Sequence, residues 1–216
     1  MLRHLYVAGV NRKHLAAAAD ICPYWLLSVT LLRKCPSWLA GYMHNRTVIW
    51  DPGTFSEDAI AYHRYRAYLD RYARSQDEFL QYDEIGDPEA TTWYLHDMRR
   101  RGYDPVPVLQ PGGNLELLRE KRMAIGGLVK LSEVNRRHYL DDLFYNNPVT
   151  ARVHLLGMCR AEWFEPYRAA VSGDSTTWIP RSEWNRHKTI AEWMQEYGEQ
   201  WIPHVPRRNT QIQLVL

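Results

Sequence analysis

Short β-favouring runs alternate with helical segments along most of this 216-residue sequence. The runs are rich in Val, Ile, Leu, Tyr and Trp, and most are followed by residues with helical spacing or by a helix-start signal. We predict strands at residues 5–9, 24–29, 47–51, 79–82, 106–109, 123–125, 153–156 and 170–178. Such alternation predicts a parallel sheet, and eight units favour closure into a (β/α)8 barrel of the TIM type.

The segments between the strands carry helix signals. Ser56 is placed to cap a helix whose apolar residues recur at three- and four-residue spacing as far as Tyr72. Asp87 followed by Pro88 is a typical helix start, and Ser132 begins another helix. Further helices are predicted at residues 11–20, 115–121, 161–169 and 183–197. An open doubly wound sheet is the alternative, but no GxGxxG motif follows the first strand.

Composition limits the class of protein. Hydrophobic residues make up 45% of the chain and charged residues 24%, which predicts one folded domain spanning residues 1–216. The three cysteines, Cys22, Cys35 and Cys159, are scattered, so neither a disulfide framework nor a metal site is expected. We see no signal peptide, and the apolar run at residues 24–32 is too short to cross a membrane. We therefore expect a soluble, cytoplasmic protein without a membrane partner.

Asp51 ends a predicted buried strand and is followed by Pro52-Gly53, which turns the chain toward solvent. A strand-ending Asp often caps its own turn. When Asp51 is considered by itself, this purely structural interpretation stays open. Polar residues or exposed backbone also end other strands, namely Asp83, Glu84, Gln110, Gly127 and Asp174. In a parallel barrel these ends meet at one mouth, where two carboxylates can act as nucleophile and proton carrier at an anomeric carbon. His154 lies within a strand and is interpreted as a hydrogen-bonded core histidine.

Basic residues gather near the C-terminus among tryptophans, although the net charge of only +2 does not by itself indicate nucleic acid. The cations are Arg181, Arg186, Lys188, Arg207 and Arg208. Cations interleaved with aromatic rings suit a phosphate backbone and unstacked bases. A solvated helix whose tryptophans pack on the core is an equally good interpretation.

Six short motifs, in order and at strand ends, resemble those of the tRNA-guanine transglycosylases. Residues 50–55, WDPGTF, resemble the family's DSGGF/Y motif, and the further matches are YDE at 82–84, LQPG at 109–112, IGGL at 125–128, HLLG at 154–157 and GDS at 173–175. The family's cysteine-and-histidine zinc subdomain is not seen after the barrel. The chain is therefore most similar to the short relatives of bacteriophages and DNA-modification clusters, which place 7-deazaguanines in DNA, and a phage-encoded member would act in the host cell cytoplasm.

This resemblance implies a base exchange without a cofactor. Asp174 would be the nucleophile at C1′ of a deoxyguanosine, and Asp51 would take a proton from the incoming 7-deazaguanine. Asp83, Gln110 and the backbone at Gly126 and Gly127 would bind the base, between Phe55 and Leu156. The partners would be guanine-containing DNA and a free 7-deazaguanine base.

Other functions stay open at this point. They are a tRNA-guanine transglycosylase-like activity, a nucleoside or DNA glycosidase that transfers the sugar to water, and a non-catalytic nucleic-acid-binding barrel subunit. The sequence also leaves open whether the chain forms a homodimer.

Overall fold

The structure, a computed structural model, describes residues 4–11, 14–32, 37–179 and 190–193. Within them eight strands form one sheet. The strands are β1 (His4–Val7), β2 (Tyr24–Ser28), β3 (Thr47–Asp51), β4 (Glu78–Phe79), β5 (Val108–Leu109), β6 (Arg122–Ile125), β7 (Arg152–Leu155) and β8 (Ala170–Ser175). Each overlaps one of the predicted runs, because these runs combine β-branched and aromatic residues with turn residues at their ends.

All pairings in the sheet are parallel, and the strand order is β4-β3-β2-β1-β8-β7-β6-β5. The first and last strands are therefore neighbours in the middle of the order. At its two edges, a parallel bridge joins Leu80, just after β4, to Val106, just before β5. The Gln81 N–H donates to the Val106 carbonyl at 2.9 Å, and the Val106 N–H donates to the Phe79 carbonyl at 2.8 Å. The prediction of a parallel eight-stranded α/β fold is thus confirmed, with the sheet curled.

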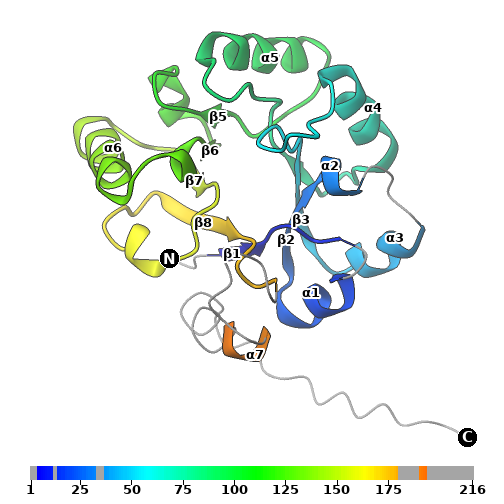
Figure 1. Cartoon of the computed structure of the whole chain (residues 1–216). Coiled ribbons are helices and arrows are strands. Elements are labelled where there is room, and N and C mark those ends of the chain that lie inside the picture. The colour runs from blue at the N-terminus through cyan, green and yellow to red at the C-terminus, as the bar shows by residue number, and fades with distance from the viewer. Residues whose placement is uncertain (1–3, 12–13, 33–36, 180–189, 194–216) are drawn as a thin grey trace, which may run out of the picture.

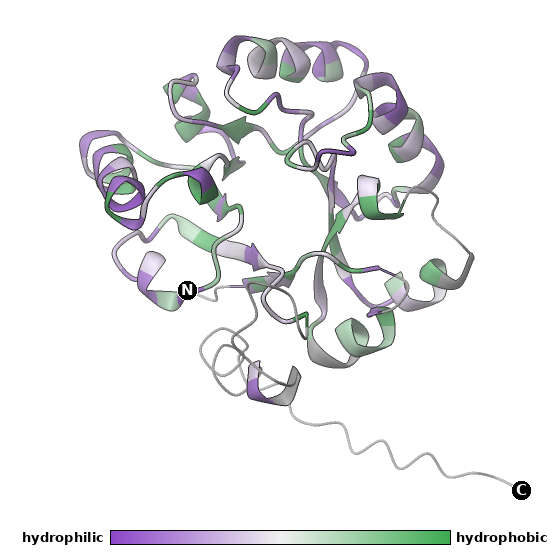
Figure 2. Cartoon of the chain, in the orientation of Figure 1, coloured by the Kyte–Doolittle hydropathy of each residue, from purple (hydrophilic) through white to green (hydrophobic). Residues whose placement is uncertain are grey.

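Helices surround the strands in Figure 1. They are α1 (Leu15–Ile21), α2 (Val29–Leu32), α3 (Ser37–Met43), α4 (Tyr62–Tyr72), α5 (Pro88–Arg100), α6 (Glu133–Asn146) and α7 (Ile190–Trp193), with short 3-10 helices η1 (Leu115–Arg119), η2 (Leu128–Lys130) and η3 (Ala161–Trp163). Figure 2 shows hydrophilic and hydrophobic residues mixed along α4, α5 and α6, as expected for helices with one face toward a sheet and one toward solvent.

The buried apolar residues form two clusters that follow the two faces of the sheet. Leu5, Val7, Trp25 and Leu27 belong to the larger cluster, which includes residues of the surrounding helices. The alternate positions form a smaller cluster without helical residues: Tyr6, Ala8, Leu26, Ile49, Leu80, Val106, Val108 and Ala124. Because successive strand residues point to opposite faces, the smaller cluster lies on the face turned away from the helices. Both faces of the sheet are therefore buried, as in α/β proteins generally.

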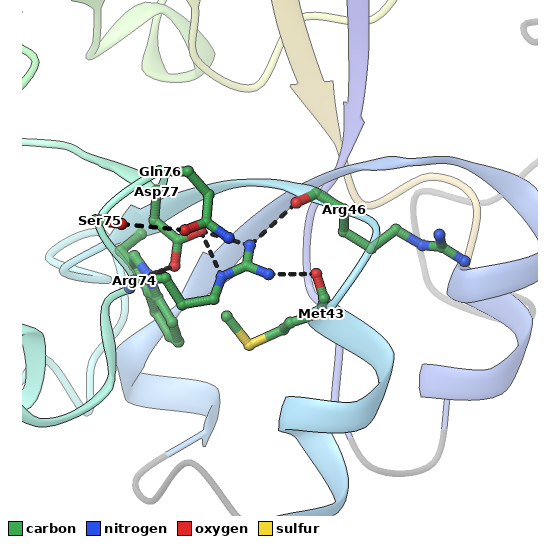
Figure 3. A network of polar contacts seen from close by, with 7 residues as sticks. Met43, Arg46, Arg74, Ser75, Gln76 and Asp77 are labelled. Atoms are coloured by element: carbon green, nitrogen blue, oxygen red, sulfur yellow. Dashed lines mark hydrogen bonds and ion pairs between the residues drawn. The ribbon is translucent and has the colours of Figure 1, made fainter.

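An ion pair between Arg74 and the buried Asp77 lies where the chain enters β3 and β4 (Figure 3). The Arg74 guanidinium contacts the Asp77 carboxylate and the backbone carbonyls of Met43 and Arg46. Asp77 also accepts a 3.0 Å hydrogen bond from the Trp50 indole N–H, and its side chain is fully buried. This network joins the chain after α4 to the chain that leads from α3 into β3, so its role is to hold that strand in place.

The predicted starts of α5 and α6 are confirmed by their caps. The Asp87 carboxylate accepts from the Ala90 N–H at 2.9 Å, and the Ser132 hydroxyl accepts from the Asn135 N–H at 3.2 Å. Ser56, in contrast, is not a cap. Its hydroxyl accepts from the Asp58 N–H and its own N–H donates to the Gly53 carbonyl, so residues 53–59 form turns and α4 begins only at Tyr62.

Two predicted helices are shorter than expected. Of residues 115–121 only Leu115–Arg119 are helical, as the 3-10 helix η1, and of residues 161–169 only Ala161–Trp163 are helical. The short helices α2 and α3 between β2 and β3 were not predicted, because residues 29–43 combine β-branched and apolar residues without a clear period. Of the helix predicted at 183–197, only Ile190–Trp193 lie within the described residues, as α7.

Candidate active site

Three aspartates lie at the carboxyl ends of strands. Asp51 is the last residue of β3, Asp83 follows β4, and Asp174 is the penultimate residue of β8. Asp83 and Asp174 are each 6% exposed, and Asp51 is partly buried. Burial raises the pKa of the Asp51 carboxyl to about 7, and the charges of Asp83 and Asp174 add to this rise. The fold thus brings all three predicted carboxylates within electrostatic reach of one another.

Asp51 is held by the two segments that flank it. Ser28 is its register partner on β2, and hydrogen bonds from Ser28 and from the Gly53 N–H oppose the rise of the Asp51 pKa. Gly53 has φ +74°, and a Cβ there would overlap the side-chain oxygens of Thr30 and Ser28. Thr30 in turn donates to the Pro52 carbonyl at 3.2 Å. The Pro-Gly turn therefore requires glycine to bring its backbone N–H to the carboxylate.

Asp83 is already paired with neutral donors. The Thr54 hydroxyl donates to its Oδ1 at 2.6 Å, and Gln110 Nε2 donates to its Oδ2 at 3.0 Å. Burial raises the pKa of the Asp83 carboxyl, and these two hydrogen bonds oppose that rise. Gln110 Nε2 also donates to the Glu84 carbonyl at 3.2 Å, while its Oε1 accepts from the Gly86 N–H at 3.0 Å. Both hydrogens of the Gln110 amide are thus in use, so a ligand would have to compete with these contacts.

Asp174 has a different set of partners. The Gly157 N–H donates to its Oδ1 at 2.8 Å, and His154 Nε2 lies 3.2 Å from the same oxygen. The other ring nitrogen of His154 lies 2.9 Å from the Ser172 hydroxyl. His154 is 4% exposed, so this pairing is shielded from water. Asp174 is therefore held through one oxygen by the Gly157 N–H and by contact with a ring nitrogen of His154.

The other predicted base-binding residues surround this region. Gly126 continues the sheet, since its N–H donates to the Leu109 carbonyl at 2.9 Å. Gly127 has φ +75° and begins η2. Leu156 is half-buried beside the smaller apolar cluster, whereas Phe55 is 61% exposed. The Lys130 ammonium lies 5.6 Å from the centre of the Phe55 ring. A base held between Phe55 and Leu156 would therefore cover an aromatic ring that is largely exposed here.

The predicted nucleic-acid-binding cations, Arg181, Arg186, Lys188, Arg207 and Arg208, lie outside the described residues. A cavity of about 380 Å³ lies between α5 and η1, lined by Gln81, His96, Arg99, Gln110 and Glu116 among others. Asp51 and Asp174 do not line it, whereas Gln110 both lines this cavity and donates to Asp83.

Sequence reasoning missed the residues that orient the aspartates. His154 is buried and hydrogen-bonded, as interpreted, and its partners are Ser172 and Asp174. Ser28, Thr54 and Ser172 were not singled out. The alternation of side chains along a strand could have indicated Ser172, because it lies two residues before Asp174 and so points to the same face of β8.

Across the described part of the chain, no three side chains of His, Cys, Asp or Glu are grouped so that they could hold a metal ion. Among the same residues, no helix has both the length and the apolar character needed to cross a membrane. No protein-family model matches this chain, and no curated protein matches it. Fold and site together define an α/β protein with a curled eight-stranded parallel sheet and a cluster of three aspartates at the carboxyl ends of its strands.

Proposed function

We propose that this protein is a base-exchange transglycosylase that replaces guanine in DNA with a 7-deazaguanine through a covalent glycosyl-aspartate. The observation that carries the proposal is that two neighbouring carboxyl groups have different environments. The Asp174 carboxylate is held by the Gly157 N–H and a ring nitrogen of His154, whereas the pKa of Asp51 is raised to about 7. One nucleophile and one proton carrier poised near neutral pH are what a two-step exchange at an anomeric carbon requires.

The proposal includes closure of the sheet into a (β/α)8 barrel with one domain. The Leu80–Val106 bridge and its flanking hydrogen bonds join the edge strands, which supports closure. The smaller apolar cluster has members from both edges and from the middle of the sheet, as the filled interior of such a barrel would. In this arrangement the strand ends that carry the aspartates surround one mouth.

In the first step, an Asp174 oxygen attacks C1′ of a deoxyguanosine, and the bond from C1′ to N9 breaks. The electron pair of that bond leaves with guanine, which takes up a proton. Asp51 can supply this proton, since its carboxyl is partly protonated at neutral pH with a pKa of about 7. Water or another group can supply it when Asp51 is replaced. The product is free guanine and a sugar esterified to Asp174.

In the second step, N9 of the incoming 7-deazaguanine attacks C1′ and displaces the Asp174 carboxylate. The N9 proton passes to ionised Asp51, so the protein returns to its starting charge. The ester retains the energy of the glycosidic bond, and no cofactor is required. A carboxyl that titrates near pH 7 can act in both steps, because it is present in both forms.

Asp83 is suited to recognise the base. An ionised carboxylate only accepts hydrogen bonds, and guanine presents N1–H and a 2-amino group as donors. Its present partners, Thr54 and Gln110, show that the carboxylate points into a region with neutral donors. On binding, the base would replace one of them, and Gln110 with the Gly127 N–H would then donate to O6.

A nucleoside or DNA glycosidase is the second candidate, since it would use the same two aspartates and differ only in the final acceptor. The deciding experiment is mass spectrometry of nucleosides and free bases from duplex DNA incubated with the protein, with and without candidate 7-deazaguanines. Exchange predicts 7-deazaguanosine in the DNA only when the base is added, and release of guanine in equal amount. Release of guanine without added base, leaving abasic sites, would instead indicate a glycosidase.

A matched control is available in Asp104→Asn. The Asp104 side chain is 90% exposed and lies before β5, at the opposite strand ends from the site. This variant should exchange bases like the wild type. Absence of both products with every base tested, in a folded preparation, would contradict the proposal and leave a non-catalytic nucleic-acid-binding subunit as the better interpretation.

A further inference from the structure

Three polar side chains on β7 and β8 form a chain of contacts that ends at the proposed nucleophile. His154 and Ser172 are register partners on the two neighbouring strands. The Ser172 hydroxyl lies 2.9 Å from His154 Nδ1, and His154 Nε2 lies 3.2 Å from Asp174 Oδ1. All three residues are less than 9% exposed. Tyr6 on β1 packs its ring edge-to-face against the His154 ring at 5.3 Å, which fixes the imidazole from another side.

For a neutral His154 ring, the donors and acceptors in this chain are consistent with one arrangement of protons. An ionised Asp174 carboxylate can only accept, so Nε2 of His154 must carry a hydrogen. In a neutral imidazole Nδ1 then has a lone pair, which accepts from the Ser172 hydroxyl. Asp174, which can only accept, thus selects the Nε2–H tautomer, and the Ser172 hydroxyl satisfies the lone pair on Nδ1 and holds the ring in place. The arrangement matches the general pattern in which a third group orients a histidine beside a reactive side chain.

Both donors engage the same oxygen of Asp174. The Gly157 N–H and His154 Nε2 bind Oδ1, and among the described residues no hydrogen bond is made to Oδ2. We infer that His154, held in place by Ser172, is a positioning residue that directs Oδ2 of Asp174 at C1′ and stabilises the carboxylate when it leaves in the second step. This inference rests on the proposed function, because it assigns a nucleophilic role to Asp174.

Loss of the His154 donor should slow the second step of the exchange more than the first. When the ester bond between Oδ2 and C1′ breaks, the negative charge returns to the carboxylate, and donors already aimed at Oδ1 stabilise it without rearrangement. Without the His154 donor, Asp174 becomes a poorer leaving group toward the incoming base. The covalent adduct should therefore persist longer relative to the rate at which product forms.

The test compares His154→Phe, His154→Gln and Ser172→Ala. Phe keeps the ring shape but has no donor, whereas the Gln amide nitrogen reaches about as far as Nε2 and can donate. We expect His154→Phe to lose about 10- to 100-fold in exchange rate while its trapped protein–DNA adduct increases as a fraction of enzyme. His154→Gln should recover most of the rate and the wild-type adduct fraction. A His154→Phe variant that exchanges at the wild-type rate, or a Gln variant no better than Phe, would overturn the inference.

A second measurement does not depend on activity. Its main result comes from the wild-type protein, so it still tests the inference if a variant folds poorly. Long-range proton–nitrogen correlation spectra of 15N-histidine protein report which ring nitrogen carries the hydrogen, and His154→Gln identifies the His154 signals. We expect the Nε2–H tautomer in the wild type and in Ser172→Ala, where the Asp174 acceptor is kept, and a mixed or reversed tautomer in Asp174→Asn. An Nδ1–H tautomer in the wild type would overturn the inference. If the wild-type protein shows no base exchange, the proposed function fails, and the spectra still decide whether His154 donates to Asp174.

Discussion

Gln110 on the segment after β5 donates to the Asp83 carboxylate after β4 at 3.0 Å, and so ties the two edge strands together at the site. The same Gln110 amide lines the outer cavity between α5 and η1. A base that takes the place of Gln110 at Asp83 would therefore exchange one buried hydrogen bond for another. The free energy of base binding should therefore depend on whether the side chain at residue 83 presents an acceptor or a donor.

Asp83→Asn should weaken base recognition more than sugar chemistry. An amide at residue 83 can present a donor toward the donors of guanine and also toward the Gln110 amide, and a mismatch of this kind costs about 1–3 kcal/mol, roughly 5- to 150-fold. Calorimetric titration of the free 7-deazaguanine base should show this loss of affinity. Asp104→Asn is the matched control. Unchanged base affinity in Asp83→Asn would show that Asp83 does not contact the base.

Asp51 should make the fold less stable as pH rises. Its pKa is about 7 in the folded protein against an ordinary value of 3.8, so between these values the folded state binds a proton that the unfolded state has lost. The free energy of unfolding should therefore fall from about pH 4 to pH 7 and then level off. Asp51→Asn should remove this slope and be more stable than the wild type at pH 8 by about 1–4 kcal/mol. Urea unfolding at pH 5 and pH 8 checks the prediction, and equal slopes for both proteins would contradict it.

The Arg74–Asp77 pair should affect stability and not catalysis. Asp77 is fully buried, and its variants would leave the partly exposed Arg74 guanidinium without its charge partner, which costs about 2–4 kcal/mol. Asp77→Asn should therefore lower the melting temperature while the exchange rate per folded molecule stays at the wild-type value. Thermal unfolding together with active-site titration separates the two effects. A folded variant that has lost exchange activity would show that β3 transmits the change to Asp51.

Strand ends could be predicted from the sequence because β-favouring runs stop at Pro, Gly or Asp. The positions of Asp51 and Asp83 followed from this rule, whereas Asp174 lay inside the strand predicted at residues 170–178, which ends in fact at Ser175. The pairing of His154 with Asp174 could not be predicted, because it depends on the register between β7 and β8, where the structure has an irregularity at Val153 and His154. Ser56 was assigned a cap because it precedes a helical pattern, but its N–H donates back to the Gly53 carbonyl and its hydroxyl accepts from the Asp58 N–H, so both groups are used in local turns. The sequence therefore lacked two kinds of information: the register between strands that are far apart in the chain, and the hydrogen bonds within local turns that compete with a helix cap.

The basic C-terminal residues should contribute to DNA binding. Reversing two of these charges, Arg181→Glu with Arg186→Glu, should weaken binding and reduce its dependence on salt, because fewer counterions are released from the DNA. Fluorescence anisotropy with a labelled duplex at several salt concentrations measures both quantities. The same salt dependence in variant and wild type would assign these residues to a solvated surface.

Trapping of the covalent protein–DNA adduct on denaturing gels tests the central claim most directly, with Asp174→Asn and Asp51→Asn compared with and without added 7-deazaguanine. Asp174→Asn has no anionic nucleophile, so it should give no adduct under any condition. Asp51→Asn should still form adduct, since guanine can take its proton from another source, but the adduct should persist after the base is added. Adduct formed by Asp174→Asn and absent from Asp51→Asn would contradict the assignment of Asp174 as the nucleophile.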